Sequence, residues 1–145
     1  MGASDDLIEF NNIAHGHAIA TEAGTSYNPI SDIVIARMSG GKLLGGCVYQ
    51  NYTGYSIGMH AAGFVPRWIN RDLLWICFHY PFMQLGCEYI FGLVPAFNLK
   101  AAEFNRNIGF TEVARIDHVF REGPMIVMRM HRDECRHLLP KKRSP

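Results

Sequence analysis

Residues 98–110, with the sequence NLKAAEFNRNIGF, constrain the fold more than any other part of the chain. The segment follows an apolar stretch, Cys87 to Val94, and leads directly into another, which indicates a helix between two strands. Asn98 is typical of a helix N-cap, because its side chain can accept a hydrogen bond from a free amide of the first turn. Gly109 is typical of the left-handed residue that ends a helix, and Phe110 should then enter the core. The chain therefore contains a strand–helix–strand unit, which favours a fold that combines helices with a sheet.

Apolar periodicity and turn residues predict the remaining elements. A helix over Leu7 to Thr21 and a loop over Thr25 to Asp32 precede a meander of three antiparallel strands. A second helix, Asp72 to Leu85, follows the meander, and Pro81 should kink it or shift its final turn. The predicted strands are Ile33 to Met38, Leu43 to Tyr52, Tyr55 to Phe64, Cys87 to Val94, Phe110 to Asp117 and Met125 to Met130.

The composition is that of one ordinary globular domain. A length of 145 residues predicts a single domain, 1–145, in which Arg132 to Pro145 forms a terminal helix and a basic tail. A net charge of +1 gives no field that would gather nucleic acid or an anionic membrane. No apolar run approaches the roughly 20 residues that a membrane helix needs, and the N-terminus lacks the pattern of a signal peptide. We expect no nucleic-acid partner, no membrane partner and a cytoplasmic location.

The cysteines and histidines do not form a recognisable metal site. Cys47, Cys77, Cys87 and Cys135 lie far apart without C-x-x-C spacing, so they are predicted to be reduced structural residues. His131-x-x-x-Cys135-x-His137 offers three potential zinc ligands but no fourth. No metal is predicted.

The motif at 98–110 and the order of the elements resemble the GCN5-related N-acetyltransferase (GNAT) superfamily, whose acetyl-CoA motif is roughly N-x-x-A-x-x-(L/F)-x-x-x-x-G-F. The likeness covers roughly Ile33 to Met130. The segments HYPFMQLG (His79 to Gly86) and RDECRHL (Arg132 to Leu138) resemble, more narrowly, the GNAT-like proteins of phages and prophages. The resemblance implies an α/β (α+β) acyl-CoA N-acyltransferase fold, with a mixed central sheet, splayed strands and helices on both faces. It also implies transfer of an acetyl group from acetyl-CoA to a primary amine by direct attack on the thioester.

The resemblance places acetyl-CoA between the parallel strands Tyr55 to Phe64 and Cys87 to Val94. Its diphosphate would cap the following helix, where free amides and the helix dipole favour an anion. With Gly86 and Asn98 as landmarks, the phosphate-binding loop falls on Pro66 to Asp72. The residues assigned to the cofactor are Gly63, Phe64, Arg67, Asn70, Arg71, Asp72, Asn98 and Asn105.

This loop departs from the family pattern (Q/R)-x-x-G-x-G/A, because Ile69 and Arg71 replace the two glycines. Two interpretations stay open. In one, Arg67 or Arg71 supplies charge to the phosphates while Asn70 caps the helix or donates to a phosphate. In the other, the loop no longer binds CoA and the basic residues only solvate the start of a helix.

The residues for proton transfer also depart from the family. A tyrosine four residues before the motif glycine commonly protonates the leaving thiolate there, and Asn105 stands at that position here. His60 is the first candidate for the general base, since neutral imidazole has a suitable pKa and alternation places it on one face with Ser56 and Gly58. A structural histidine bonded within the sheet is the alternative. Glu88, beside the other of the two parallel strands, is the second candidate.

The acceptor, a small-molecule, peptide or protein amine, would bind between the first helix, the Thr25 to Asp32 loop and the Asn51 to Tyr55 turn. The tyrosines of this region either receive a cationic amine or pack across strands; they are Tyr27, Tyr49, Tyr52 and Tyr55. A non-catalytic acyl-CoA-binding module and a protein-interaction module are the alternatives to an enzyme. A homodimer that pairs through the last strand, Met125 to Met130, is also expected to be feasible.

Overall fold

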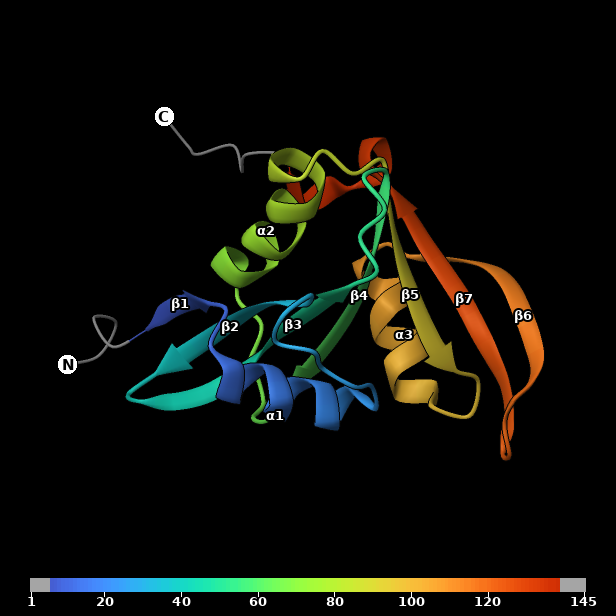
Figure 1. Cartoon of the computed structure of the whole chain (residues 1–145), viewed down its shortest axis with the longest axis horizontal. Coiled ribbons are helices and arrows are strands. Elements are labelled where there is room, and N and C mark those ends of the chain that lie inside the picture. Colours follow the sequence, from blue (N-terminus) through green and yellow to red (C-terminus); the bar gives the residue numbers. More distant parts are fainter. Residues whose placement is uncertain (1–5, 139–145) are drawn as a thin grey trace.

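The computed structural model describes residues 6–138 and places a seven-stranded sheet at the centre of the molecule (Figure 1). The strand order is β1-β2-β3-β4-β5-β7-β6. Every neighbouring pair is antiparallel except β4 and β5, which are parallel. The strands are β1 (Leu7–Phe10), β2 (Ile33–Ser39), β3 (Lys42–Gln50), β4 (Ser56–Gly63), β5 (Tyr89–Pro95), β6 (Thr111–Phe120) and β7 (Gly123–His131). The helices are α1 (Ile13–Ala23), α2 (Arg71–His79) and α3 (Leu99–Ile108).

This arrangement confirms the predicted mixed sheet and the predicted three-stranded meander, β2-β3-β4. The helix predicted from Leu7 is wrong at its start. Leu7–Phe10 forms β1, which pairs with β2, and α1 begins only after Asn12. Asn11 has a φ of 58°, which turns the chain out of the strand, and Asn12 accepts a hydrogen bond from the His15 amide as the N-cap.

Helix α2 ends at His79, and the chain continues as a π-helical turn, Tyr80–Gln84, that contains Pro81. Proline cannot donate a backbone hydrogen bond, so the regular ladder of the helix stops there. The prediction that Pro81 alters the final turn is confirmed. Gly86 follows with a φ of 72°, a left-handed conformation that suits the end of a helical segment.

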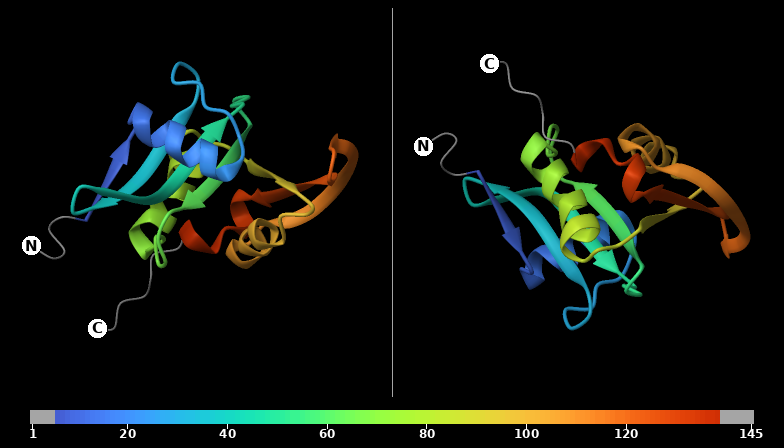
Figure 2. Two further views of the ribbon diagram at one scale, coloured as in Figure 1. Left: turned by 90° about the horizontal axis from the view of Figure 1, so that it is seen from below. Right: turned by 90° about the horizontal axis from the view of Figure 1, so that it is seen from above.

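Helices cover both faces of the sheet. Figure 2 shows α1 in front of the strands in one view and α2 in front of them in the opposite view. Under α1, Ile19 and Ala20 pack with alternate residues of the strands, among them Val34 and Val48. On the other face a larger cluster includes residues of α2, α3, β2 to β5 and β7, so one core joins the two halves of the sheet.

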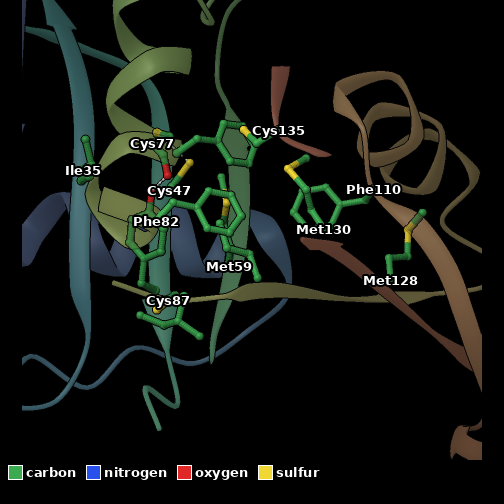
Figure 3. Close-up of a cluster of buried hydrophobic side chains, with 14 of the residues drawn as sticks. Ile35, Cys47, Met59, Cys77, Phe82, Cys87, Phe110, Met128, Met130 and Cys135 are labelled. Atoms are coloured by element: carbon green, nitrogen blue, oxygen red, sulfur yellow. Dashed lines mark hydrogen bonds between the residues drawn. The ribbon is translucent and has the colours of Figure 1, made fainter. Parts of the chain in front are cut away.

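Sulfur-bearing side chains are prominent in this larger core, as Figure 3 shows. The cysteines are buried and free, as predicted, and Cys47 Sγ lies 3.1 Å from Cys77 Sγ. Phe110 is also buried there, in agreement with its position after the motif glycine. The core therefore holds the strand–helix–strand unit against the meander.

The predicted dimer edge is wrong, because the last strand is not an edge. Strand β7, which contains Met125 to Met130, lies between β5 and β6. The edge strand on this side of the sheet is β6, whose residues are exposed along almost its whole length.

After β7 the chain forms two short 3₁₀ turns, Arg132–Glu134 and Arg136–Leu138, where a terminal helix was predicted. The rest of the predicted tail, 139–145, lies outside the described residues. No helix in residues 6–138 combines the length and the apolar character needed to cross a bilayer.

Candidate functional site

The two parallel strands separate soon after they begin to pair. Register partners are Ser56 with Tyr89, Ile57 with Ile90 and Gly58 with Phe91, and no further residues pair. Figure 1 shows β4 and β5 diverging from this shared end. Residues 59–63 of β4 pair only with β3, and residues 92–95 of β5 pair only with β7. The gap between the diverging strands is a wedge. The inner edges of both strands offer backbone donors and acceptors to a ligand in this wedge.

The wedge contains a cleft of about 750 Å³. Its walls include the ends of β4 and β5, the loop after β4, one side of α3 and the last turn of α1. The predicted site residues that line it are His60, Gly63, Phe64, Arg67, Asn98 and Asn105. The predicted residues that do not line it are Asn70, Arg71, Asp72 and Glu88.

The loop between β4 and α2 ends in a helix cap. Asn70 Oδ1 accepts a hydrogen bond of 2.8 Å from the Leu73 amide, which confirms its predicted role as a cap. Arg71 and Asp72 occupy the exposed first turn. Within residues 6–138, no acceptor is found for the amides of these two residues, so the start of α2 retains free donors.

Trp68 fills space beside the loop. An added Cβ at Gly63 would come within 2.0 Å of the indole, and one at Gly45 within 2.4 Å, so both glycines make room for the ring. The indole stacks on Phe104 of α3 with ring centroids 5.7 Å apart. This pair joins the loop to the opposite wall and narrows the cleft between them.

His60 lies on the wall of the cleft that faces α1. Ile57 and Met59 of the same strand pack in the core under α2, whereas Ala62 packs under α1, so alternation directs His60 toward α1. Burial lowers the pKa of His60 below its ordinary value of 6.5, and the negative charge of Asp32 opposes this shift. Among the described residues, none forms a hydrogen bond with the imidazole. The lowered pKa favours the neutral imidazole at pH 7, which has a nitrogen that can accept a proton.

Acidification should destabilise the protein through His60 and His137. Burial lowers both pKa values below 6.5, and the hydrogen bond from His137 to the Ile108 carbonyl offsets part of its shift. Below pH 6.5 the unfolded chain therefore binds more protons than the folded one, and the free energy of unfolding should fall as the pH falls. Urea unfolding between about pH 7.5 and 5.5 measures this slope. His60→Gln should make the slope shallower, and an unchanged slope would show that the folded protein does not lower the pKa of His60.

Glu88 is placed differently from its prediction. It precedes β5 at the closed end of the wedge, where its amide donates to the Tyr55 carbonyl. Its carboxylate lies 3.0 Å from His131 Nε2 and accepts a 3.0 Å hydrogen bond from Arg132. These partners, which come from the end of β7, keep Glu88 away from the cleft, and the structure gives no support to Glu88 as a base.

The motif helix has the predicted local structure. Asn98 Oδ1 accepts a hydrogen bond of 3.1 Å from the Ala101 amide, and Gly109 ends α3 with a φ of 118°. Asn105 lines the cleft, and its Nδ2 lies 3.2 Å from where a Cβ on Gly92 would be. The side chain thus approaches β5 closely at a glycine, but an amide has no proton to give as an acid.

Two of the four predicted acceptor tyrosines have structural roles. Tyr49 is buried and its hydroxyl donates to the Cys77 carbonyl at 2.5 Å, which agrees with the predicted alternative of packing and not with a role in an acceptor site. Tyr52 donates to the Leu85 carbonyl at 2.9 Å. Tyr27 packs against Gly16 and lies edge-on to His17, and Tyr55 lies beside Tyr89.

Three residues of the cleft were not identified from the sequence. Glu22, at the end of α1, brings a carboxylate to the wall that also carries His60, and Lys100 brings a cation from α3. Trp68 stands inside the predicted loop, next to one of the two positions that lack the family glycine, and a large aromatic residue there was the signal that could have identified it. Glu22 and Lys100 carry no comparable signal, because both resemble ordinary solvent-facing helix residues.

No protein-family model and no curated protein matches the sequence. Solved structures match the fold. A mutant of the spermidine N-acetyltransferase SpeG from Vibrio cholerae superposes with a TM-score of 0.67 at 16% identity, over 90% of this chain and 95% of that one. The putative acetyltransferase yncA from Salmonella typhimurium, solved with its cofactor acetyl-CoA, gives 0.66 at 15% identity, over 91% and 96%. A GNAT-family acetyltransferase from Bacillus anthracis gives 0.65 at 9% identity, over 90% and 96%. The chain has the acyl-CoA N-acyltransferase fold of these proteins.

Proposed function

We propose that this protein is a cytoplasmic N-acetyltransferase that uses acetyl-CoA and a primary amine. The observation that carries the proposal is the wedge: two inner strand edges without partners border a cleft that contains a neutral histidine. Pantetheine carries amide groups, which match such strand edges as a further strand would. The side chain of Arg67, which lines the cleft, suits the diphosphate, as do the free amides at the start of α2, which lie just beyond the cleft at the end of the same loop.

Acetyl-CoA supplies an activated acetyl thioester when it is bound. The attacking amine must give up a proton as its bond to the acetyl carbon forms, and His60 is positioned to take that proton. The carbon–sulfur bond breaks, and the thiolate takes its proton from water, because Asn105 has none to give. Glu22 places a negative charge on the acceptor side of the cleft, which favours the approach of a cationic amine. SpeG, one of the similar structures, is named for the amine spermidine, which is consistent with an amine acceptor.

Thermal unfolding with and without acetyl-CoA tests the binding step. At a concentration about 100 times Kd, the ligand should stabilise the folded protein by about 2.7 kcal/mol, which raises Tm by roughly 5 to 10 °C for a chain of this size. Release of free thiol in the presence of an amine panel tests turnover. The panel should include a polyamine, free amino acids, a peptide with a free N-terminus and a lysine peptide, each with a no-amine control.

A second function, acyl-CoA binding without turnover, is favoured by Asn105 at the position of the usual acid and by the Trp68–Phe104 pair that narrows the cleft. The two functions differ in one result. A rise in Tm without thiol release for any amine would favour the binding module, and no rise at millimolar acetyl-CoA would exclude both functions.

A further inference from the structure

Arg37 of β2 links the predicted phosphate loop to the segment before β1. Its Nη1 donates to the carbonyl oxygens of Arg67 and Trp68, both at 2.9 Å. Its Nε and Nη2 donate to the Asp6 carboxylate at 3.1 and 2.9 Å. The side chain is only 13% exposed. A planar guanidinium held on two sides in this way has one orientation, so it fixes the two carbonyls that it contacts.

The loop needs such support because it contains no glycine. Arg67 has a φ of 60°, in the left-handed region that residues with a Cβ rarely adopt. Families that use glycine in a phosphate loop obtain this backbone shape without strain. Here the bonds from Arg37 hold the carbonyls of Arg67 and of the next residue in place.

Fixing these carbonyls also fixes the amides that follow them. In a trans peptide the N–H points opposite to the C=O of the same unit, and the chain has no cis peptide among its described residues. The amides of Trp68 and Ile69 therefore point away from Arg37, and the loop that carries them lines the cleft with Arg67 and Trp68. Neither amide has an acceptor among residues 6–138. Successive free amides of this kind form a concavity that binds anions.

We infer that Arg37 is a positioning residue for the acyl donor: it orients the loop amides that receive the diphosphate, and so replaces with a side chain what glycines provide in the family pattern. Arg37 itself does not line the cleft, so it acts through the loop and not by touching the ligand. The inference rests on the proposed acetyl-CoA site. It assigns Asp6 a supporting role, since the hydrogen bond from Arg37 lowers the pKa of Asp6 and keeps this carboxylate charged.

The test compares two acyl donors and two arginines. Arg37→Lys keeps the charge but loses the planar guanidinium that donates to both partners. It should weaken acetyl-CoA binding about tenfold, with kcat at saturation changed less than about twofold. S-acetylpantetheine, which has no diphosphate, should bind wild type and Arg37→Lys equally. Arg115→Lys is the matched control, because Arg115 also forms a two-bonded pair with a carboxylate, Glu112, but lies on β6 away from the loop. Calorimetry measures the acetyl-CoA affinities, and displacement measures those of the weaker donor.

Each outcome decides for or against the inference. Asp6→Asn, which leaves the loop carbonyls bonded to Arg37, should weaken acetyl-CoA binding in the same direction by a smaller factor. Unchanged affinity of Arg37→Lys for acetyl-CoA would overturn the inference, and so would an equal loss for both donors, which indicates a general structural defect. If the wild type binds acetyl-CoA but acetylates no amine, the proposed catalysis fails while the affinities still decide the role of Arg37. If the wild type does not bind acetyl-CoA, both proposals fail.

Discussion

Replacing His60 by glutamine should lower kcat for acetyl transfer by about 10²- to 10⁴-fold, the usual contribution of a general acid or base. Glutamine keeps the approximate size and a hydrogen-bonding group but cannot accept a proton at neutral pH. The Kd for acetyl-CoA should change little, because the proton is taken from the amine and not from the donor. Steady-state kinetics with an accepted amine, together with calorimetry for acetyl-CoA, measure the two quantities separately.

The pH profile gives this prediction a second readout. Because burial lowers the pKa of His60 below 6.5, the wild-type rate should be level near neutral pH and fall only in more acidic solution, as the imidazole becomes protonated. His60→Gln should lose this acidic limb. His118→Gln, an exposed histidine on β6, is the control and should keep both the rate and the limb. A His60→Gln enzyme with wild-type kcat would remove His60 from the mechanism.

Gly46→Ala should have the largest effect on stability, lowering the free energy of unfolding by at least about 3 kcal/mol. A Cβ at Gly46 would lie 2.2 Å from the Ile35 carbonyl oxygen and 2.8 Å from the Ala36 Cα. Both are backbone atoms of β2, which is paired on both sides and cannot move without breaking ladder hydrogen bonds. The methyl group would also press on Ile19 of α1, at 2.9 Å.

Gly58→Ala is the matched control for this substitution. Gly58 lies on the neighbouring strand β4, where an added Cβ would contact only the Gln50 carbonyl group. It would lie 3.2 Å from the carbonyl oxygen and 4.0 Å from the carbonyl carbon. We expect a loss of about 1 kcal/mol or less there. Urea unfolding measures both variants, and similar losses in the two would show that the close approach of β2 and β3 does not determine the cost.

The parts of the fold that depend on local interactions were predictable. Asn98 and Gly109 frame α3 as expected, because a cap needs only residues within the next turn. The segment Leu7 to Phe10 was not predictable in this way. Its apolar spacing also suits a helix, and only pairing with β2, which is more than twenty residues away in the sequence, makes it a strand.

The same distinction between local and long-range interactions holds for the candidate site. His60 was predictable because alternation along one strand fixes its face. Glu88 was not, because its partners His131 and Arg132 come from the far end of the chain. Arg37 gave no signal at all, since its contact with the loop joins residues 30 and 31 positions apart. The resemblance to phage-borne proteins stays a prediction, as does a homodimer.

The separation of β4 and β5 also bears on aggregation. Strand edges with unpaired backbone groups invite pairing with other chains, and proteins usually block them. Here two such edges face each other inside the molecule, with α3 on one side of the gap and the stacked Trp68 and Phe104 rings across it. We expect a slender extended ligand to enter this gap more readily than a strand of another protein, which carries side chains on both faces. If the proposed acetyl-CoA site is correct, the same unpaired strand edges would serve ligand binding and be protected from pairing with another chain.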